Sequence, residues 1–150
     1  MKIRVLTIGK KHETWVKQGI EHFQKRLRAP FELEIVIIPA AKLSSEQASE
    51  NESGTILKRL KSTDFVILLD ERGKNLSSVE FSRLIQDHVD RQIVIIIGGA
   101  FGVNQALKTR ADFTWSLSNL VFPHQLVRLM LVEQLYRAQE IAKGTGYHHD

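Results

Sequence analysis

Residues 92–99, QIVIIIGG, constrain the fold of this chain more than any other segment. Five β-branched residues follow one another before two glycines end the run, and β-branched residues are typical of strands. The run is continuously apolar instead of alternating, which indicates a strand buried on both faces of a parallel sheet. The segment DFVILLD at 64–70 has the same character, and KIRVLTIG at 2–9 is also expected to be a buried strand. We therefore expect a parallel sheet with helices on both faces.

Strands and helices should alternate, because the hydrophobic period alternates between 2 and 3.6 along the chain. The expected strands are 2–9, 32–38, 64–70, 92–99 and 112–118. The expected helices are 12–28, 44–62, one that begins with a Ser77–Glu80 capping box, 104–110 and 123–142. This alternation predicts an α/β fold with a doubly wound parallel sheet, although it does not give the order of the strands.

Length and composition limit the classes of protein to consider. A chain of 150 residues fits a single domain, 1–150. The sequence contains no cysteine, which excludes a disulfide scaffold, a thiol nucleophile and a cysteine-ligated metal site. No apolar run approaches the roughly 20 residues that span a bilayer. The apolar stretch within the opening MKIRVLTIGKK is too short for a signal peptide. We expect a cytoplasmic protein.

The charge is uneven along the sequence. The formal net charge is +4, and it lies in the first half, because residues 76–150 carry as many acidic as basic side chains. A basic surface suits a polyanion such as RNA. A solubilising helix face is an equally good explanation on charge alone.

Three strand ends carry distinctive sequence, and open α/β sheets bind ligands at the carboxyl ends of their strands. They are LLDERGK at 68–74, IIIGGAFG at 95–102 and SLSNLVFPH at 116–124. GGAFG lets the backbone approach a ligand, but it matches neither dinucleotide nor phosphate-loop spacing, and a tight structural turn explains it equally well. SLSNLVFPH offers backbone groups within an apolar wall that suits an adenine ring, although an ordinary strand-to-helix connection is the simpler interpretation. Pro123 fits a first helical position.

The helix expected at 123–142 is apolar around most of its circumference. A homodimer interface explains this pattern better than a central helix of a monomer core does. Glu133 and Arg137 are spaced to pair along the helix, and His124 and Arg128 share one face near its start. The tail that follows, 144–150, contains two adjacent histidines that could accept protons or contact RNA, or could simply fray. They form no pattern of metal ligands with other residues.

These segments together resemble the RlmH family of SPOUT-class methyltransferases. The resemblance rests on LLDERGK, IIIGGAFG and WSLSNLVFPHQLVRLMLVEQLYRAQEI with a terminal YHH, and it extends to the opening MKIRVLTIGK. It implies an S-adenosylmethionine-dependent enzyme that methylates N3 of a pseudouridine in helix 69 of 23S rRNA on the assembled ribosome. It also implies a homodimer of SPOUT (α/β knot) domains, each with a C-terminal trefoil knot whose loops form the cofactor pocket.

The resemblance also implies roles for individual residues. Those expected to bind the cofactor are Leu69, Gly98, Gly99, Ser118, Asn119, Leu120, Val121, Phe122 and Pro123. His148 is expected to assist loss of the N3 proton and Arg137 to hold a phosphate or the uracil oxygens, with the tail completing the partner subunit's site. Gly146 stands where the family pattern has proline. Those expected to contact RNA are Lys10, Lys11, Lys25, Arg26 and Arg28. No metal is expected.

Two other functions compete with this hypothesis. A non-catalytic ribosome-binding or RNA-binding factor on the same fold would bind ribosomes but not S-adenosylmethionine. A small-molecule α/β enzyme that uses another nucleotide is disfavoured, because the dinucleotide and phosphate-loop fingerprints are missing.

Overall fold

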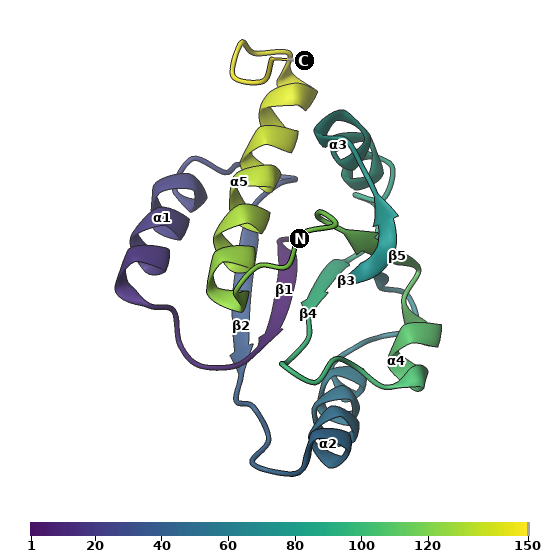
Figure 1. Cartoon of the computed structure of the whole chain (residues 1–150). Coiled ribbons are helices and arrows are strands. Elements are labelled where there is room, and N and C mark those ends of the chain that lie inside the picture. The colour runs from purple at the N-terminus through teal and green to yellow at the C-terminus, as the bar shows by residue number, and fades with distance from the viewer. Residues whose placement is uncertain (150) are drawn as a thin grey trace.

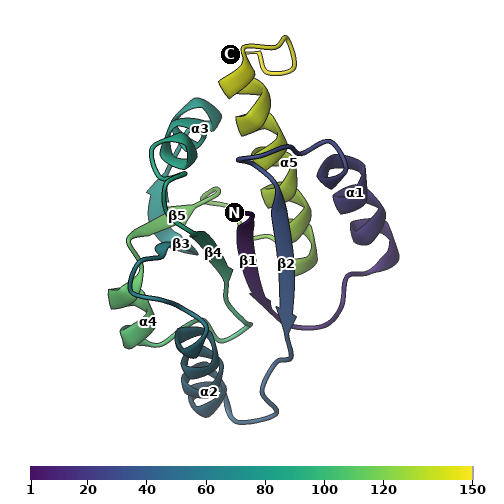
Figure 2. The ribbon, with the colours of Figure 1, turned by 180° about the vertical axis from the view of Figure 1, so that it is seen from behind.

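Residues 1–149, which the computed structural model describes, form a five-stranded parallel sheet (Figures 1 and 2). Its strands are β1 (Ile3–Ile8), β2 (Leu33–Ile38), β3 (Phe65–Asn75), β4 (Ile93–Ile97) and β5 (Phe113–Ser116). Their order is β2-β1-β4-β3-β5, and every neighbouring pair is parallel. The structure thus confirms the expected parallel α/β sheet and adds the order, in which β4 enters between β1 and β3.

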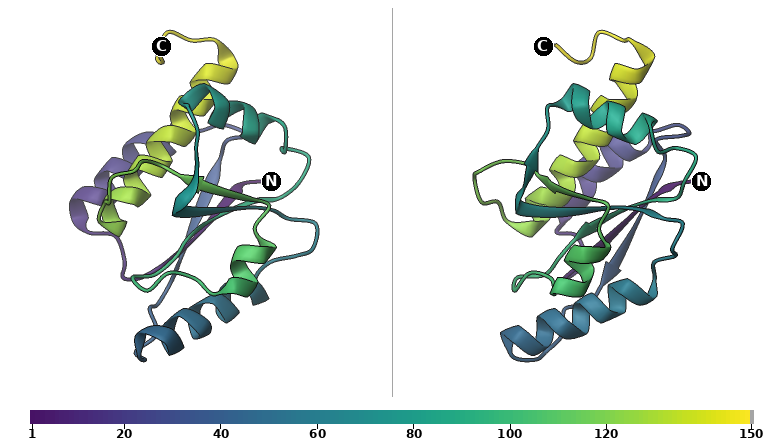
Figure 3. Two further views of the ribbon diagram at one scale, coloured as in Figure 1. Left: turned by 45° about the vertical axis from the view of Figure 1, so that its right-hand side comes forward. Right: turned by 90° about the vertical axis from the view of Figure 1, so that its right-hand side faces the viewer.

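Helices cover both faces of the sheet, as Figure 3 shows. They are α1 (Thr14–Gln24), α2 (Ser45–Lys58), α3 (Ser78–Gln86), α4 (Gln105–Arg110) and α5 (His124–Lys143). On one face α5 lies between α1 and α3 and packs against both, while α2 and α4 cover the other face. None of the helices within residues 1–149 is both long enough and apolar enough to cross a membrane.

The continuous apolar run of β4 fills two separate cores. Ile93, Ile95 and Ile97 pack into the cluster under α1, α3 and α5. Val94 and Ile96 point the other way, into the cluster under α2 and α4. All of these side chains are buried, because successive residues of a strand face opposite sides of the sheet.

The ends of the helices differ in how well the sequence predicts them. The capping box of α3 is confirmed: Ser77 Oγ accepts a hydrogen bond from the N–H of Glu80 at 3.0 Å, and Glu80 Oε1 accepts one from the N–H of Ser77 at 2.8 Å. The predicted helices 12–28 and 44–62 are longer than α1 and α2. Pro123 occupies the N-cap position of α5, without a side-chain capping bond, and not its first helical position.

Strand β3 runs past the predicted end at residue 70 and carries an irregularity that shapes the edge of the sheet. Its pairing with β5 stops at Leu69 and resumes at Lys74, so the residues between them bulge out of the ladder. The pairing resumes where Gly73 lies against the backbone of Thr114. This bulge lifts Asp70, Glu71 and Arg72 above the carboxyl edge of the sheet, where β4 and β5 also end.

Two glycine substitutions should change stability in opposite directions. A Cβ on Gly73 would lie 2.6 Å from the carbonyl atoms of Thr114, which are backbone and cannot swing aside. We expect Gly73→Ala to lower the free energy of unfolding by about 1–3 kcal/mol. A Cβ on Gly54, inside α2, would meet no atom within 4 Å, so Gly54→Ala should raise it by about 0.5–1 kcal/mol. Urea unfolding followed by circular dichroism measures both, and shifts of the same sign would contradict this account of β3 and β5.

Candidate functional site

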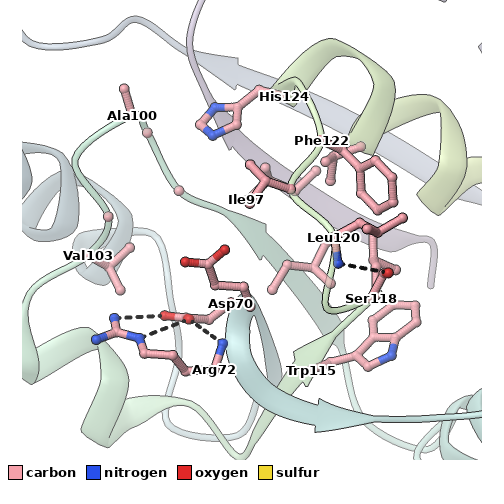
Figure 4. Close-up of a pocket in the computed structure, with 18 residues that line it drawn as sticks. Asp70, Arg72, Ile97, Ala100, Val103, Trp115, Ser118, Leu120, Phe122 and His124 are labelled. Atoms are coloured by element: carbon pink, nitrogen blue, oxygen red, sulfur yellow. Dashed lines mark hydrogen bonds and ion pairs between the residues drawn. The ribbon is translucent and has the colours of Figure 1, made fainter.

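A cavity of about 360 Å³ opens where β3, β4 and β5 end (Figure 4). Its volume lies within the range of small-molecule sites. Three chain segments that are far apart in sequence line it together with the start of α5. The lining residues are Leu69, Asp70, Glu71, Arg72, Ile97, Gly98, Gly99, Ala100, Gly102, Val103, Trp115, Leu117, Ser118, Leu120, Val121, Phe122, His124 and Val127.

The structure brings together most of the residues that the sequence analysis expects to bind a cofactor. Those that line the cavity are Leu69, Gly98, Gly99, Ser118, Leu120, Val121 and Phe122. Asn119 and Pro123 are not among the lining residues, although both belong to the same loop. The three strand ends therefore converge on one hollow, as the sequence predicts.

The GGAFG segment is a tight turn built from glycine. Gly102 has a φ of +75°, and its N–H donates a hydrogen bond to the carbonyl oxygen of Gly99 at 3.1 Å. An added Cβ on Gly98 would lie 2.9 Å from Cγ1 of Val103, and one on Gly99 would lie 2.6 Å from Oε1 of Glu52. The turn is therefore structural, and the same glycines leave bare backbone along the cavity.

The loop between β5 and α5 is held by its own hydrogen bonds. Ser116 Oγ donates to the carbonyl oxygen of Ser118 at 2.9 Å, and Ser118 Oγ accepts from the N–H of Leu120 at 3.0 Å, as Figure 4 shows for the second bond. Leu120 and Val121 are nevertheless 69% and 82% exposed. The loop is thus ordered, with apolar side chains turned outward at the mouth of the cavity.

Asp70 is an anionic group in the cavity wall. Burial alone would raise its pKa, but hydrogen bonds from the Arg72 side chain and backbone lower the pKa below its usual value. Two side-chain contacts of 3.3 Å and one backbone contact of 2.9 Å make up this pair (Figure 4). A carboxylate that stays charged can accept hydrogen bonds from a ligand or attract a cation.

Arg128 joins the start of α5 to the end of β1. Its side chain is 2% exposed and donates to Thr7 Oγ1 at 3.3 Å, to the carbonyl oxygen of Lys10 at 2.7 Å and to His12 Nδ1 at 3.3 Å. One turn earlier, His124 lines the cavity. Burial and the nearby Arg128 lower the pKa of His124. The effect of Arg128 on the pKa of His124 agrees with their expected place on one face of α5, and the hydrogen bonds of Arg128 hold the β1–α1 loop against that helix.

The two residues expected to be catalytic meet each other, but away from the cavity of their own chain. Arg137 pairs with Glu133 at 2.6 Å, and its Nη1 donates to His148 Nδ1 at 3.1 Å. Tyr147 donates to Glu133 Oε2 at 3.0 Å, so the tail folds back on α5. Arg137 lies thirteen residues after His124, which is about 20 Å along the helix. The tail emerges beyond that far end of α5 (Figure 1).

The five residues expected to contact RNA form two separate groups. Lys10 and Lys11 are exposed in the loop beside Arg128, near the cavity. Lys25, Arg26 and Arg28 are exposed at the other end of α1. There, Gln139 of α5 accepts from the N–H of Arg28 and donates to the carbonyl oxygen of Arg26. This second group therefore lies near the Arg137 end of α5.

Several residues that line the cavity are not among those that the sequence predicts to bind a cofactor. Asp70 and Arg72 lie within the LLDERGK segment. Their position just after a buried strand is the feature of the sequence that indicates a place in the site. Trp115 lines the cavity while stacking on Phe81 at 4.3 Å, a contact between distant segments that sequence spacing does not reveal. Within residues 1–149, no group of three or more histidine or acidic side chains is arranged to hold a metal ion.

Comparison with known proteins supports a single family. A family model described as "Predicted SPOUT methyltransferase" matches residues 1–148. The chain is 42% identical to the ribosomal RNA large subunit methyltransferase H of Cytophaga hutchinsonii, covering 99% of this chain and 100% of that protein. It is 36% and 39% identical to the proteins of the same name from Acetivibrio thermocellus and Desulfitobacterium hafniense, with 99% of each chain covered.

The environment of His12 gives a pH-dependent prediction. Burial, followed by the positive charges of Arg128 and Lys17, lowers the pKa of His12 below its usual value of about 6.5. The unfolded chain then binds the proton at a higher pH than the folded chain, so His12 makes the free energy of unfolding fall as the pH decreases below about 6.5. Lys17→Gln should raise the pKa of His12, whereas Lys25→Gln, at the far end of α1, should not. NMR titration of the ring protons measures this, and a pKa of His12 above its usual value would refute the arrangement.

Proposed function

The chain belongs to the SPOUT methyltransferase family, and on that premise we propose that it methylates large-subunit ribosomal RNA with S-adenosylmethionine as the methyl donor. The observation that carries this proposal is the match of the whole chain to methyltransferases of one name. We take the target to be N3 of a pseudouridine in helix 69 of 23S rRNA on the assembled ribosome. We also take residues 1–150 to act as a single domain in the cytoplasm.

The cavity suits this methyl donor in its chemistry. Gly98 and Gly99 leave a backbone cradle that a Cβ would disturb, and backbone groups there can bind the edge of an adenine ring. Ile97, Phe122 and Val127 supply apolar surface for the flat face of the ring. Asp70 stays ionised and can accept hydrogen bonds from hydroxyl or ammonium groups. The proposed binding residues are those of the sequence analysis that line the cavity, with Asn119 and Pro123 supporting the loop.

The work of the protein in such a reaction is mainly to position groups. When bound, S-adenosylmethionine supplies a methyl group that is already activated by a positive sulfonium. The loops that follow β4 and β5 would orient the donor, and their apolar side chains would exclude water. Asp70 would fix one polar end of the donor through hydrogen bonds. These roles require the loops to remain rigid, and the hydrogen bonds of Ser116 and Ser118 support that.

We propose that His148 takes up the N3 proton of the target base, with Arg137 binding a phosphate or the uracil oxygens. A guanidinium can only donate, so in the contact between Arg137 Nη1 and His148 Nδ1 the ring nitrogen accepts. A neutral ring then carries its proton on Nε2, and Nδ1 is its basic nitrogen. His148 can therefore act as a base once Arg137 turns to the RNA, which links substrate binding to proton transfer.

A homodimer would bring these groups to the cavity. Arg137 lies about 20 Å along α5 from the cavity residue His124, and His148 contacts Arg137. Leu126, Met130 and Ile141 leave the outer side of α5 only half-buried, and the apolar Leu120 and Val121 are exposed nearby. If two copies pack across α5 in opposite directions, the tail of each reaches the cavity of the other.

The same dimer would join the two basic groups around each cavity. Lys10 and Lys11 would approach from the chain that forms the cavity, and Lys25, Arg26 and Arg28 would approach from the partner, beside its tail. Both groups are exposed, as phosphate contacts require. We propose that they hold the ribosomal RNA backbone on either side of the target base.

We also propose that the C-terminal part of the chain forms a trefoil knot, as in the family that the sequence resembles. The bulge after Leu69, the turn at Gly98–Gly102 and the loop after β5 meet in one place, which supports the proposal. The pocket would then be formed by the knotted segments themselves.

Binding and transfer can be measured separately. We expect calorimetric titration to show one S-adenosylmethionine bound per chain, and radiolabelled methyl groups to enter assembled ribosomes in preference to free 23S rRNA. Gly98→Leu should abolish both, because its side chain would clash with Val103 and enter the cavity. Binding to ribosomes without binding the donor would instead indicate a non-catalytic ribosome-binding factor.

The shared site can be tested by mixing two inactive variants. His148→Ala removes the proposed base and Gly98→Leu blocks the cavity. When the two are refolded together, half of the dimers are mixed and each holds one intact site, so activity should recover to about a quarter of the unmodified level. Each variant alone serves as the control, and circular dichroism checks that both fold. If the mixture stays as inactive as the separate variants, each chain works without its partner's tail.

A further inference from the structure

Glu52 is a buried acidic residue that the proposed reaction does not yet use. It lies in α2 and is 5% exposed. Its Oε2 accepts a hydrogen bond from the N–H of Ala41 at 2.9 Å. Its Oε1 meets no hydrogen-bond partner among residues 1–149. Burying a carboxylate with one oxygen unsatisfied is unfavourable, so a compensating interaction is expected.

The unsatisfied oxygen lies directly behind the wall of the cavity. An ideal Cβ on Gly99 would be 2.6 Å from Oε1, and Gly99 itself lines the cavity. The backbone of Gly99 therefore lies against the carboxylate and also forms part of the cavity wall. A larger residue at position 99 would displace the Glu52 carboxylate from the cavity wall.

The rest of α2 holds Glu52 in this position. Ser49 Oγ donates to the carbonyl oxygen of Gly102 at 3.3 Å, and Ser53 Oγ accepts from the N–H of Asn104 at 2.9 Å. Asn104 also donates to Glu50 Oε2 at 3.3 Å. One face of α2 is thus bonded to the segment that follows the glycine turn, with Glu52 between these contacts.

The charged side chains that line the cavity favour a cationic ligand. Among its lining residues within the described chain, Asp70 and Glu71 are acidic and Arg72 is basic, and Arg72 is paired with Asp70. With Glu52 behind the wall, three carboxylates face one guanidinium, and Lys108 is the next cation near Asp70. The excess of negative charge is confined to the lining residues and Glu52, since Lys10, Lys11 and Arg128 lie nearby but do not line the cavity.

We propose that Glu52 makes the cavity select the charged methyl donor over its neutral product. This rests on the proposed function. In the transfer, the bond from sulfur to the methyl carbon breaks and leaves its electron pair on sulfur, a bond from the methyl carbon to N3 forms, and the N3 proton leaves to the base. The sulfonium becomes a neutral thioether, so the attraction of the buried carboxylate is present before transfer and absent after it.

The kinetic consequence distinguishes this role from a structural one. Glu52 stabilises the full charge of the bound donor more than the reduced charge of the transition state. Removing its charge should therefore raise the KM for the donor and leave kcat unchanged or higher. Loss of loop structure would instead lower kcat.

The test compares S-adenosylmethionine with S-adenosylhomocysteine in calorimetric titrations of the full chain. Glu52→Gln keeps the size of the side chain and an oxygen for the N–H of Ala41. We expect it to weaken binding of S-adenosylmethionine about tenfold, as for unit charges several ångströms apart at a protein's effective dielectric constant. Binding of S-adenosylhomocysteine should change by less than about twofold. Because the charge is buried, the effect should persist in 0.5 M salt. Glu46→Gln, on the first turn of the same helix, is the matched control.

Three outcomes would overturn the proposal. Equal weakening of both ligands in Glu52→Gln would assign Glu52 a structural role only. Unchanged binding of both would mean that its charge does not reach the cavity. The third outcome concerns the unmodified protein. If it binds S-adenosylmethionine and S-adenosylhomocysteine with equal affinity, selection by charge is refuted. If it binds neither ligand, the proposed function fails as well.

Discussion

Helices cover both faces of the sheet, so neither face is open to a polar ligand. The side chains of β4 pack alternately into two apolar clusters, and neighbouring strands do the same. Polar chemistry is therefore confined to the edges of the sheet, where the strands give way to loops. At the carboxyl edge, β3 lies between β4 and β5, so the loops that follow these three strands lie next to one another. The cavity is the result of that confinement.

Around this edge, long-range contacts fix loops that would otherwise be independent. Arg128 holds the loop after β1 against α5 through three acceptors. The turn after β4 rests on α2, and the bulge in β3 rests on the backbone of β5. Each loop is thus braced by an element distant in sequence, which is how a small fold can present a rigid site.

The sequence predicts best what is local or periodic. The apolar run at 93–97, the capping box of Ser77 and Glu80, and the pairing of Glu133 with Arg137 depend on residues a few positions apart, and all are confirmed. The position of the cavity also follows from a general rule of parallel sheets.

What the sequence cannot predict depends on contacts between distant segments. The extension of β3 past residue 70 needs β5 beside it, and the return of Tyr147 to Glu133 needs the tail to fold back. The position of Glu52 behind Gly99 requires the packing of α2 under the sheet. None of these leaves a periodic or short-range pattern, so only the folded chain reveals them.

The close approach of Gly99 and Glu52 also has an evolutionary consequence. Position 99 cannot gain a side chain while Glu52 keeps its position, because a Cβ there would lie 2.6 Å from Oε1 of Glu52. In descendants of this chain the two positions should drift as a pair, with any bulkier residue at 99 accompanied by a shorter one at 52. Such linked substitutions would reflect the short distance between the two positions in the folded chain.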